Sequence, residues 1–448
     1  MVALHAAAAL LPTGWANNVA IVLDGERIAS VASGVTPDAA AERHAVIVPA
    51  AGNLHSHAFQ RAMSGLAERR GPADDSFWSW RSVMYKFALS MTPEHVAAVA
   101  AQAYVEMLEA GFARVGEFHY LHHDQNGEPY DNIAEMAERI AEASAEAGIG
   151  LTLLPVLYTH GGFGPLPPSQ GQRRFINNVD RYGTLMAACD ILIGGVAGGR
   201  LGIAPHSLRA ATLDEIETVL PLAKGGPVHI HIAEQTLEVD DCLKAHGARP
   251  VQLLLDTLPV DERWCLIHAT HLMPVEVSGI ARSRAVVGLC PITEANLGDG
   301  TFSGASYFAQ GGRFGIGSDS NVLISLAGEL RQYEYSQRLG QRARNVIAAP
   351  GASTGQTLLE LATAGGAQAL GRDAGIAVGM PADLVTLNVG DVRYLPPAAQ
   401  LDAWIFGGDV QVGDVWALGR KRVVGGRHVE RETIRRRFER AMKQLLNA

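Results

Sequence analysis

Short apolar runs alternate with longer amphipathic segments through the middle of this chain. Each run is too short for a typical helix and carries apolar side chains on both faces, which is typical of strands in a parallel sheet. We predict such strands at 46–50, 113–118, 151–158, 201–206, 228–232, 264–268, 285–289 and 313–317. Helices are predicted at 92–108, 132–147, 173–189, 212–224, 250–256, from 274 onward and in the stretch that ends at 370. Eight strands that alternate with helices indicate an α/β protein with a closed (β/α)8 TIM-like barrel.

The two ends of the chain have a different pattern, in which short strands are separated by turn residues. Near the start, predicted strands at 19–23 and 27–31 flank Asp24-Gly25, a strong hairpin signal. Near the end, strands are predicted at 382–387, 410–418 and 422–424, followed by an arginine-rich outer helix at 433–446. We therefore predict a small β-sandwich domain from residues 1–48 and 375–448, and a barrel domain at 49–374.

The charge balance narrows the range of partners. The chain has 448 residues, a net charge of -9, 48% hydrophobic residues and 19% charged residues. The negative charge argues against nucleic acid or an anionic membrane as a partner, and no apolar run reaches the roughly 20 residues that span a bilayer. The four cysteines are scattered without a Cys-x-x-Cys pair, and no basic segment precedes the first Ala-rich run. We therefore expect a cytoplasmic protein without a signal peptide.

Polar side chains mark the ends of five predicted barrel strands. His55 and His57 follow the first strand, and side chains two apart in an extended segment point the same way. Later strands end in His206, His231, His268 and Asp319. An isolated His-x-His pair is more often a solvated or core pair. Here, however, the strand ends of a barrel meet at one face, and imidazoles with a carboxylate suit a divalent metal such as zinc.

This order of residues resembles the amidohydrolase superfamily over nearly the whole chain, including 350–371 and 379–385. The resemblance implies one divalent metal in each subunit of a homodimer, with His268 as a catalytic group beside it. The implied ligands are His55, His57, His231 and Asp319. Members with two metals usually end strand four in a carboxylated lysine, whereas this chain has Ala204-Pro205-His206 there. We therefore predict a single metal, zinc, with iron as the alternative.

A carboxylate three residues after His231 points to a type of reaction. The His-x-x-Glu spacing of His231 and Glu234 resembles the deaminase branch of the superfamily, in which Glu carries protons to the leaving nitrogen. Bound zinc lowers the pKa of water from about 15.7 to around 7, which makes hydroxide available at neutral pH. We expect Glu234 to transfer the proton and His268 to orient the hydroxide or stabilise the tetrahedral intermediate. Asp319 would hold the water as well as the metal.

Basic and amide side chains near the strand ends indicate an anionic substrate. Arginine pairs bidentately with carboxylates, so Arg81 and Arg209 suggest a substrate with one or two of them, whereas Arg61 is expected in a surface salt bridge. The segments 53–61, 78–81, 116–123, 204–209 and 317–321 are similar to deiminases of histidine degradation, which hydrolyse a small dicarboxylate amidine. The resemblance implies that the substrate is held by Gln60, Arg81, Tyr120, His206 and Arg209.

Three alternatives stay open at this point. A guanine-, purine- or cytosine-type deaminase of the same branch would need an aromatic stacking pocket and no paired arginines. A non-catalytic barrel would usually have lost metal ligands, and none is missing here. Hydrolysis of an amide such as a hydantoin is disfavoured by the missing strand-four lysine and by the His-x-x-Glu spacing.

Other histidines and one loop have less specific signals. We expect His119, His122 and His123 to lie behind the site or in a loop rather than to be ligands, and His229 to be a hydrogen-bonded core residue. The glycine- and proline-rich segment 161–171 is expected to form a long loop over the site, which could serve as a lid.

Overall fold

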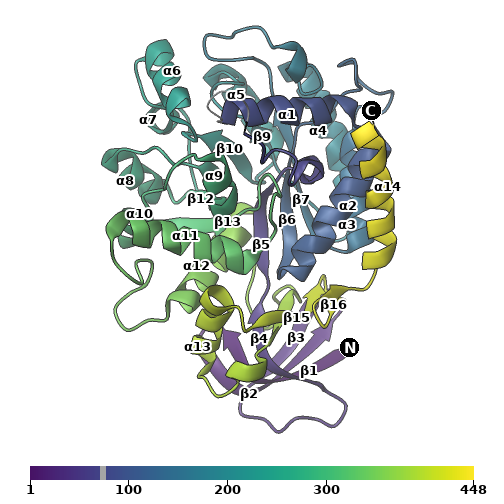
Figure 1. The fold of residues 1–448 in the computed structure, drawn as a ribbon, viewed down its shortest axis with the longest axis vertical. Helices are drawn as coiled ribbons and strands as arrows, with labels where there is room; N and C mark the ends of the chain where they lie inside the picture. Colours follow the sequence, from purple (N-terminus) through teal and green to yellow (C-terminus); the bar gives the residue numbers. More distant parts are fainter. Residues whose placement is uncertain (71–76, 448) are drawn as a thin grey trace.

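The computed structural model describes residues 1–70 and 77–447. Figure 1 shows a barrel of strands and helices that stands on a smaller sheet built from both ends of the chain. The barrel strands are β5 (Ala51–Ser56), β6 (Phe112–His119), β7 (Gly150–Leu157), β8 (Arg200–Leu201) with β9 (Ala204–Pro205), β10 (Val228–Ile232), β11 (Trp264–His268), β12 (Val286–Leu289) and β13 (Arg313–Ile316). Neighbouring strands pair in parallel. Single bridges from Ser56 to Asp319 and from Ile203 to Val228 join the two halves, which confirms the predicted barrel.

The first barrel strand was predicted a few residues too early. The apolar run at 46–50 belongs to β4 (Glu42–Pro49), which lies in the small sheet between β1 (Val2–Leu11) and β14 (Leu384–Asn388). The run is apolar because this central strand is buried, and the barrel strand β5 follows directly after Ala50. His55 therefore lies inside β5 and His57 just beyond its end.

The fourth barrel strand is also shorter and more broken than predicted. Instead of one strand at 201–206, β8 pairs with Thr152 and Leu153, and β9 pairs with Val156 and Leu157. The interruption falls at Gly202, where a Cβ atom would lie only 2.5 Å from the carbonyl oxygen of Pro227. The chain thus passes close to its neighbour at a position that only glycine fits.

Helix ends follow local capping signals. Thr92 caps α2 (Pro93–Glu109), as expected, and α3 (Glu135–Ala147) ends at Gly148, whose φ is 77°. Asn178 caps α4 (Val179–Gly194), so this helix begins later than predicted. Pro221 lies where α5 (Leu213–Val219) gives way to the 3-10 turn η3 (Leu220–Ala223).

One helix, α6 (Thr236–His246), was not predicted. The other helices around the barrel are α1 (Phe77–Ser90), α7 (Pro250–Thr257), α8 (Pro274–Ser283), α9 (Pro291–Leu297), α10 (Gly304–Ala309), α11 (Leu326–Gln341) and α12 (Thr354–Ala369).

Strands from the two chain ends form one small β domain, as predicted. They are hydrogen-bonded into an eight-stranded sheet in the order β17-β16-β15-β14-β4-β1-β2-β3. Its remaining members are β2 (Gly14–Asp24), β3 (Arg27–Ala32), β15 (Gln411–Ala417), β16 (Arg420–Val424) and β17 (Arg427–His428). On the strength of this sheet we propose the division into residues 1–48 with 375–448 and residues 49–374. The last helix, α14 (Arg431–Asn447), packs on α2, and its buried residues are Ile434, Ala441 and Leu445.

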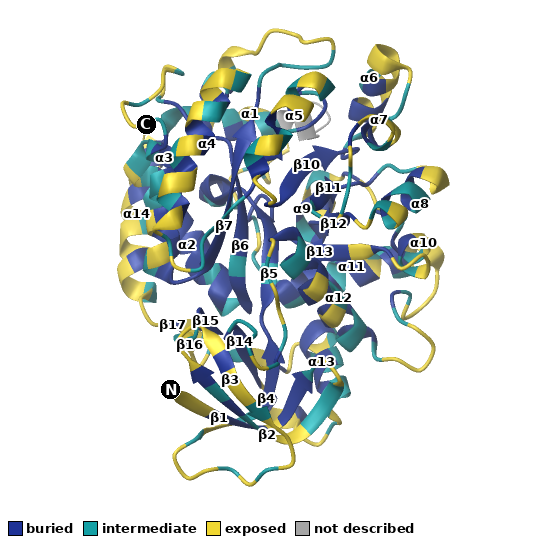
Figure 2. Cartoon of the chain, turned by 180° about the vertical axis from the view of Figure 1, so that it is seen from behind, coloured by how far each residue is buried: buried dark blue, intermediate teal, exposed yellow. Residues whose placement is uncertain are grey.

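The barrel strands are buried, while the surrounding helices expose their outer faces (Figure 2). Apolar side chains fill the barrel interior below the strand ends, among them Leu54, Ile267 and Val286. The polar residues at the strand ends therefore sit on an apolar floor, which lowers the local dielectric and strengthens their mutual interactions. Within the described part of the chain, no helix combines the length and apolar character needed to cross a membrane.

Candidate functional site

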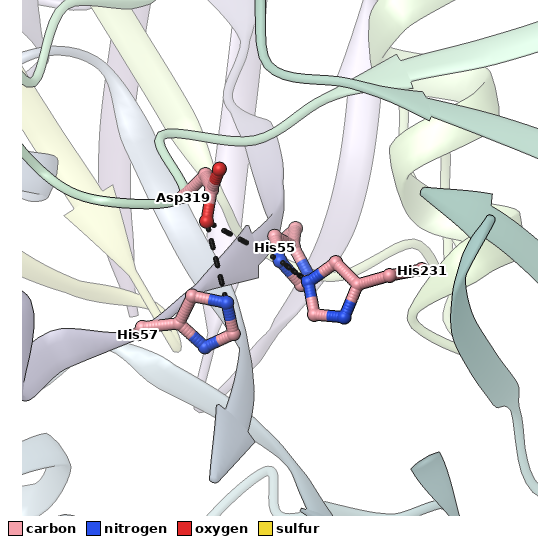
Figure 3. A group of neighbouring side chains, drawn as sticks. All are labelled: His55, His57, His231 and Asp319. Carbon is pink, nitrogen blue, oxygen red and sulfur yellow. Dashed lines mark hydrogen bonds and ion pairs between the residues drawn. The ribbon is translucent and has the colours of Figure 1, made fainter. Parts of the chain in front are cut away.

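Three imidazoles and one carboxylate converge at the carboxyl ends of the barrel strands (Figure 3). One oxygen of Asp319 lies 3.3 Å from Nε2 of His57 and 3.6 Å from Nε2 of His55. Nε2 of His231 lies 3.0 Å from Nε2 of His55. All four residues are buried, and their candidate ligand atoms lie within 4.8 Å of one another. The structure therefore brings together the four side chains that the resemblance implied as ligands.

The hydrogen bonds behind these imidazoles fit a metal site. Nδ1 of His57 donates to the carbonyl of Phe118 at 2.9 Å, and Nδ1 of His231 donates to the carbonyl of His206 at 3.0 Å. Because a carbonyl can only accept, Nδ1 carries the proton in each ring and Nε2 presents its lone pair. Burial lowers the pKa of His57 and of His231, and it lowers the pKa of His55 to about 3. Neutral imidazoles with inward lone pairs are what a divalent cation requires.

The backbone at several strand ends adopts an uncommon conformation. Ala233, His268 and Asp319 have φ values of 52°, 67° and 46°, in the left-handed region that side-chain-bearing residues rarely occupy. Such backbone strain persists only where the surroundings fix it, and it concentrates at functional sites. The fold therefore fixes the backbone conformation of these strand-end residues.

A network of polar groups links the end of the last barrel strand, β13, to the first barrel strand, β5. The side-chain amide of Asn53 donates to the hydroxyl of Ser318 at 2.6 Å, and its side-chain oxygen accepts from the main-chain N–H of Ser318 at 3.0 Å. Asn321 accepts from Ser318 at 2.6 Å and donates to the main-chain carbonyl of His57 at 3.1 Å. Because all of these groups are buried, losing one partner would leave the other unsatisfied. The network therefore positions Asp319 against His57.

Glu234 and His268 lie beside the four converging side chains. Nε2 of His268 is 3.8 Å from a carboxylate oxygen of Glu234 and 3.8 Å from one of Asp319. Burial raises the pKa of Glu234, so this carboxyl takes up a proton more readily than an exposed one. Burial opposes a charge on His268, but Glu234, Glu294 and Asp319 outweigh it and raise the pKa of the imidazole. A carboxyl and an imidazole that both accept protons are suited to general acid–base chemistry.

Glu234 and His268 line a cavity, and every residue that was expected to hold the substrate lines the same cavity. Gln60 donates to the hydroxyl of Tyr120 at 2.7 Å, and Arg81 donates to the hydroxyl of Tyr158 at 3.2 Å. The side chains that line the cavity are His57, Gln60, Trp80, Arg81, Met84, Tyr85, Tyr120, Tyr158, Phe175, His206, Arg209, His231, Glu234, His268, Leu297 and Asp319. The cavity thus brings Glu234 and His268 together with the guanidinium groups of Arg81 and Arg209 in one lining.

The electrostatic surroundings keep Arg209 charged. Burial opposes its charge, but the phenol of Tyr158 and the carboxylates of Glu238 and Glu234 raise the pKa of the guanidinium further. Glu238 itself accepts from the N–H groups of Ala233 and Glu234 at 3.2 and 3.1 Å. The carboxylate of Glu238 therefore stabilises both the loop that carries Glu234 and the positive charge of Arg209.

The structure also places the histidines and the arginine that were not assigned to the site. His122 and His123 bond to the carbonyls of Val156 and Ile176 at 3.0 and 2.8 Å, as structural residues do. His229 bonds to the carbonyl of Ala369 at 2.8 Å, which confirms it as a hydrogen-bonded core residue. Arg61 forms the expected ion pair, at 2.6 Å from Glu106. His119 is buried, and its ring packs on His122.

Several buried carboxylates near the site were missed by the sequence analysis. Glu294 accepts from Nδ1 of His268, and Glu117 accepts from the N–H of Ala58 at 2.7 Å and from the hydroxyl of Tyr104 at 3.1 Å. Asp299 accepts from the side chain of Gln235. A weak signal existed for Glu117, which interrupts the apolar strand at 113–118. Glu294 and Asp299 lie in or just after a short helix and carry no sequence signal of their own.

Comparison with known proteins agrees with this fold. The sequence pattern of the amidohydrolase family matches residues 46–420, and that of the formimidoylglutamate deiminase HutF N-terminal domain matches residues 1–45. The chain belongs to the amidohydrolase family, whose members are metal-dependent hydrolases.

Individual relatives give a finer comparison. Formimidoylglutamate deiminase of Pseudomonas aeruginosa is 50% identical over 455 aligned positions, which cover 100% of both chains. A 5-methylthioadenosine/S-adenosylhomocysteine deaminase of Natronomonas pharaonis is 28% identical and covers 80% of this chain and 76% of its own. Among solved structures, an amidohydrolase from Brucella melitensis is 55% identical, with a TM-score of 0.98 and full coverage of both chains. An adenosine deaminase from Xanthomonas campestris has a TM-score of 0.83 at 21% identity, covering 100% of this chain and 99% of its own, which shows a shared fold.

Proposed function

We propose that this chain is a metal-dependent deiminase that hydrolyses N-formimino-L-glutamate to N-formyl-L-glutamate and ammonia, a step of histidine degradation. The full-length 50% identity to the formimidoylglutamate deiminase of Pseudomonas aeruginosa carries this proposal. The cavity adds support of its own, because Arg81, Arg209 and Glu234 all line it. The guanidinium groups can bind substrate carboxylates, and the carboxylate can act at an amidine.

The reaction exchanges a nitrogen for an oxygen at one carbon. The oxygen of water bonds to the formimino carbon, and the bond from that carbon to its terminal nitrogen breaks. Starting from the neutral amidine, both protons of the water end on the departing nitrogen, which leaves as ammonia. The enzyme therefore needs a group that first accepts a proton from water and then donates it to nitrogen.

The proposed metal ligands are the four converging side chains, His55, His57, His231 and Asp319. The lone pairs of His57 and His231 face inward because both Nδ1 atoms donate to carbonyls. When bound, a divalent metal lowers the pKa of water so that hydroxide is available at neutral pH. We propose one metal in each subunit, zinc, with iron as the alternative.

Glu234 is the proposed proton carrier. Its burial raises its pKa, so the carboxylate accepts a proton from water more readily than an exposed one and can pass it to the leaving nitrogen. His268 faces the same space, with Nε2 at 3.8 Å from Glu234, and is proposed to orient the attacking oxygen and to stabilise negative charge on it. Asp319 is proposed to hold the attacking oxygen by accepting its hydrogen.

The remaining cavity residues are proposed to bind the substrate. Arg209 and Arg81 would each bind a carboxylate, since a guanidinium offers two parallel N–H donors. Gln60 and Tyr120 already share a hydrogen bond of 2.7 Å, so one group can present the other to a polar atom of the substrate. His206, whose Nδ1 lies 3.1 Å from the Ser207 hydroxyl, is proposed as a further donor.

A purine-type deaminase is the second candidate, and one observation favours it. The cavity wall contains the aromatic rings of Tyr85, Tyr120, Tyr158 and Phe175, which could stack on a nucleobase. Two guanidinium groups in the same wall argue for a carboxylate ligand instead. A nucleoside carries no negative charge to pair with them.

Ammonia release decides between these candidates. The purified protein should release ammonia from N-formimino-L-glutamate and yield N-formyl-L-glutamate by mass spectrometry, with little release from guanine, adenosine or 5-methylthioadenosine. Greater turnover of a purine would overturn the proposed substrate. No turnover of any of them, together with a protein that binds no metal, would indicate a non-catalytic barrel.

Location and assembly are separate proposals. We infer a cytoplasmic protein, because all four cysteines are free and buried, as a reducing compartment favours. We propose a homodimer by analogy with the family. Light scattering of the purified protein measures that state directly.

A further inference from the structure

Glu294 is a buried carboxylate next to His268 that the proposed reaction does not yet use. One of its oxygens accepts from Nδ1 of His268 across 3.3 Å. We propose that Glu294 is a positioning residue, which fixes the ring of His268 so that its other nitrogen faces the reacting atoms. This inference rests on the proposed function, because it assigns a task within that reaction.

The backbone fixes the position of Glu294 itself. The oxygen that bonds to His268 also accepts from the main-chain N–H of Cys290 at 2.9 Å, and the N–H of Glu294 donates to the carbonyl of Cys290 at 2.8 Å. Both contacts lie where β12 ends and α9 begins. Glu294 is only 6% exposed, so water competes little for its carboxylate. The acceptor therefore stands at a fixed point beside His268.

Ring stacking alone leaves two orientations open to His268. Its ring lies parallel to that of His231, with centroids 5.6 Å apart and planes inclined by 15°. Turning the ring by half a revolution about the Cβ–Cγ bond would preserve that stacking but would exchange each nitrogen with a carbon. The hydrogen bond to Glu294 exists in only one of the two orientations. Glu294 therefore selects one ring orientation of His268, which stacking on His231 alone does not do.

The selected orientation places Nε2 where the chemistry is proposed. In it, Nε2 lies 3.8 Å from an oxygen of Glu234 and 3.8 Å from an oxygen of Asp319. The opposite orientation would turn a carbon towards these carboxylates and remove the polar contact with the attacking oxygen. Since that contact matters during reaction more than during binding, loss of Glu294 should lower kcat and leave KM nearly unchanged.

Two substitutions of Glu294 test this role. Glu294→Gln retains an oxygen acceptor, whereas Glu294→Ala removes it. We expect kcat to fall about 10-fold in the Gln variant and about 100-fold in the Ala variant, taking the range known for partners behind metal-ligating imidazoles as the guide for His268. KM should stay within about twofold, because the lost contact acts on the attacking oxygen rather than on the bound substrate. Metal content should match the wild type, because His268 is not among the four converging side chains.

A matched control is available on the neighbouring helix. Glu329 is buried and accepts at 2.8 Å from the N–H of Ile292, which lies in the same short helix as Glu294. Burial raises the pKa of Glu329, so its neutral form is well matched by glutamine. Glu329→Gln should therefore retain wild-type kcat, while its melting temperature reports any general cost of changing a buried carboxylate.

The outcomes separate this inference from the proposed function. If the wild type turns over N-formimino-L-glutamate but Glu294→Ala retains its kcat within about twofold, the positioning role is wrong. Equal losses in Glu294→Gln and Glu329→Gln would also overturn it, because they would indicate a general effect of replacing a buried carboxyl group. If the wild type itself does not turn over this substrate, the proposed function fails first.

Discussion

The main-chain N–H of His57 donates to the carbonyl of Asp319 at 3.0 Å, while Nε2 of the same histidine lies 3.3 Å from the Asp319 carboxylate. His57 follows the first barrel strand and Asp319 follows the last. The same two residues therefore help to close the barrel and to build the candidate metal site. Integrity of the barrel and binding of the metal should be thermodynamically linked.

Metal removal should lower thermal stability as well as activity. A ligand that binds only the folded state contributes about 4 kcal/mol when its free concentration is about 1,000 times its Kd. Dialysis against a chelator should therefore lower the melting temperature measured by calorimetry, and adding zinc back should restore it. In a His57→Ala variant, the same treatment should have a much smaller effect. Unchanged stability of the wild type after complete metal loss would contradict this linkage.

Replacing Glu234 by glutamine should separate metal binding from turnover. The amide cannot carry a proton, so Glu234→Gln should lower kcat by about 100-fold to 10,000-fold. Metal content, measured by elemental analysis, should match the wild type because Glu234 is not among the four converging side chains. A variant that retains normal turnover would refute the role of Glu234 as proton carrier.

Replacing Arg209 should weaken substrate binding. A hydrogen bond to a charged group is worth about 1.5–3 kcal/mol, so Arg209→Met should raise KM by about 10-fold to 100-fold. Arg61→Met provides the matched control, because Arg61 pairs with Glu106 outside the cavity. Steady-state kinetics should show a normal KM for the control. An unchanged KM in Arg209→Met would exclude this guanidinium as a carboxylate ligand.

Acid should weaken the attachment of the C-terminal segment through His428. Its Nε2 bonds to the carbonyl of Ala147 at 2.8 Å, its Nδ1 accepts from the N–H of Glu430 at 3.1 Å, and burial lowers its pKa below 6.5. Below about pH 6.5 the unfolded chain takes up a proton that the folded chain resists. The stabilising contribution is therefore complete above that pH and is lost as the pH falls towards the folded value, by at most about 1.4 kcal/mol per pH unit.

A His428→Gln variant tests that pH dependence. Glutamine can still donate to Ala147 but does not titrate. The wild type should lose more unfolding free energy than the variant between about pH 7.5 and about pH 5.5, a range that spans the ordinary histidine pKa, as measured by denaturant titration. Equal losses would mean that other groups account for the acid sensitivity.

Sequence patterns predicted the parts of the site that depend on regular strands. His55 and His57 share a face because of the two-residue period of a strand. His231 lies next to the end of a predicted strand and His268 at the end of another, and these strands match β10 and β11 residue for residue. Five strand ends must meet in a closed barrel, so their convergence followed from the fold. Local periodicity was enough for these residues.

The missed features depend on contacts between distant segments. Glu294 contacts His268 only because α9 packs beside the end of β11, and no local sequence pattern predicts that contact. The break at Gly202 depends on the nearby carbonyl of Pro227, and the apolar run at 46–50 is equally compatible with a central strand of either sheet. In each case the deciding partner lies outside the window in which a sequence pattern can be read.

The position of β4 has a consequence for how the protein is made. β4 pairs with β1 on one side and with β14 on the other, and β14 comes from the far end of the chain. At about 5–20 residues per second, the ribosome needs tens of seconds to deliver β14 after β4 has emerged. During that interval β4 presents an apolar strand with one open edge, which is prone to pair with other nascent chains. Truncated products that end before β14 should therefore aggregate, and efficient production should depend on chaperones that cover this edge.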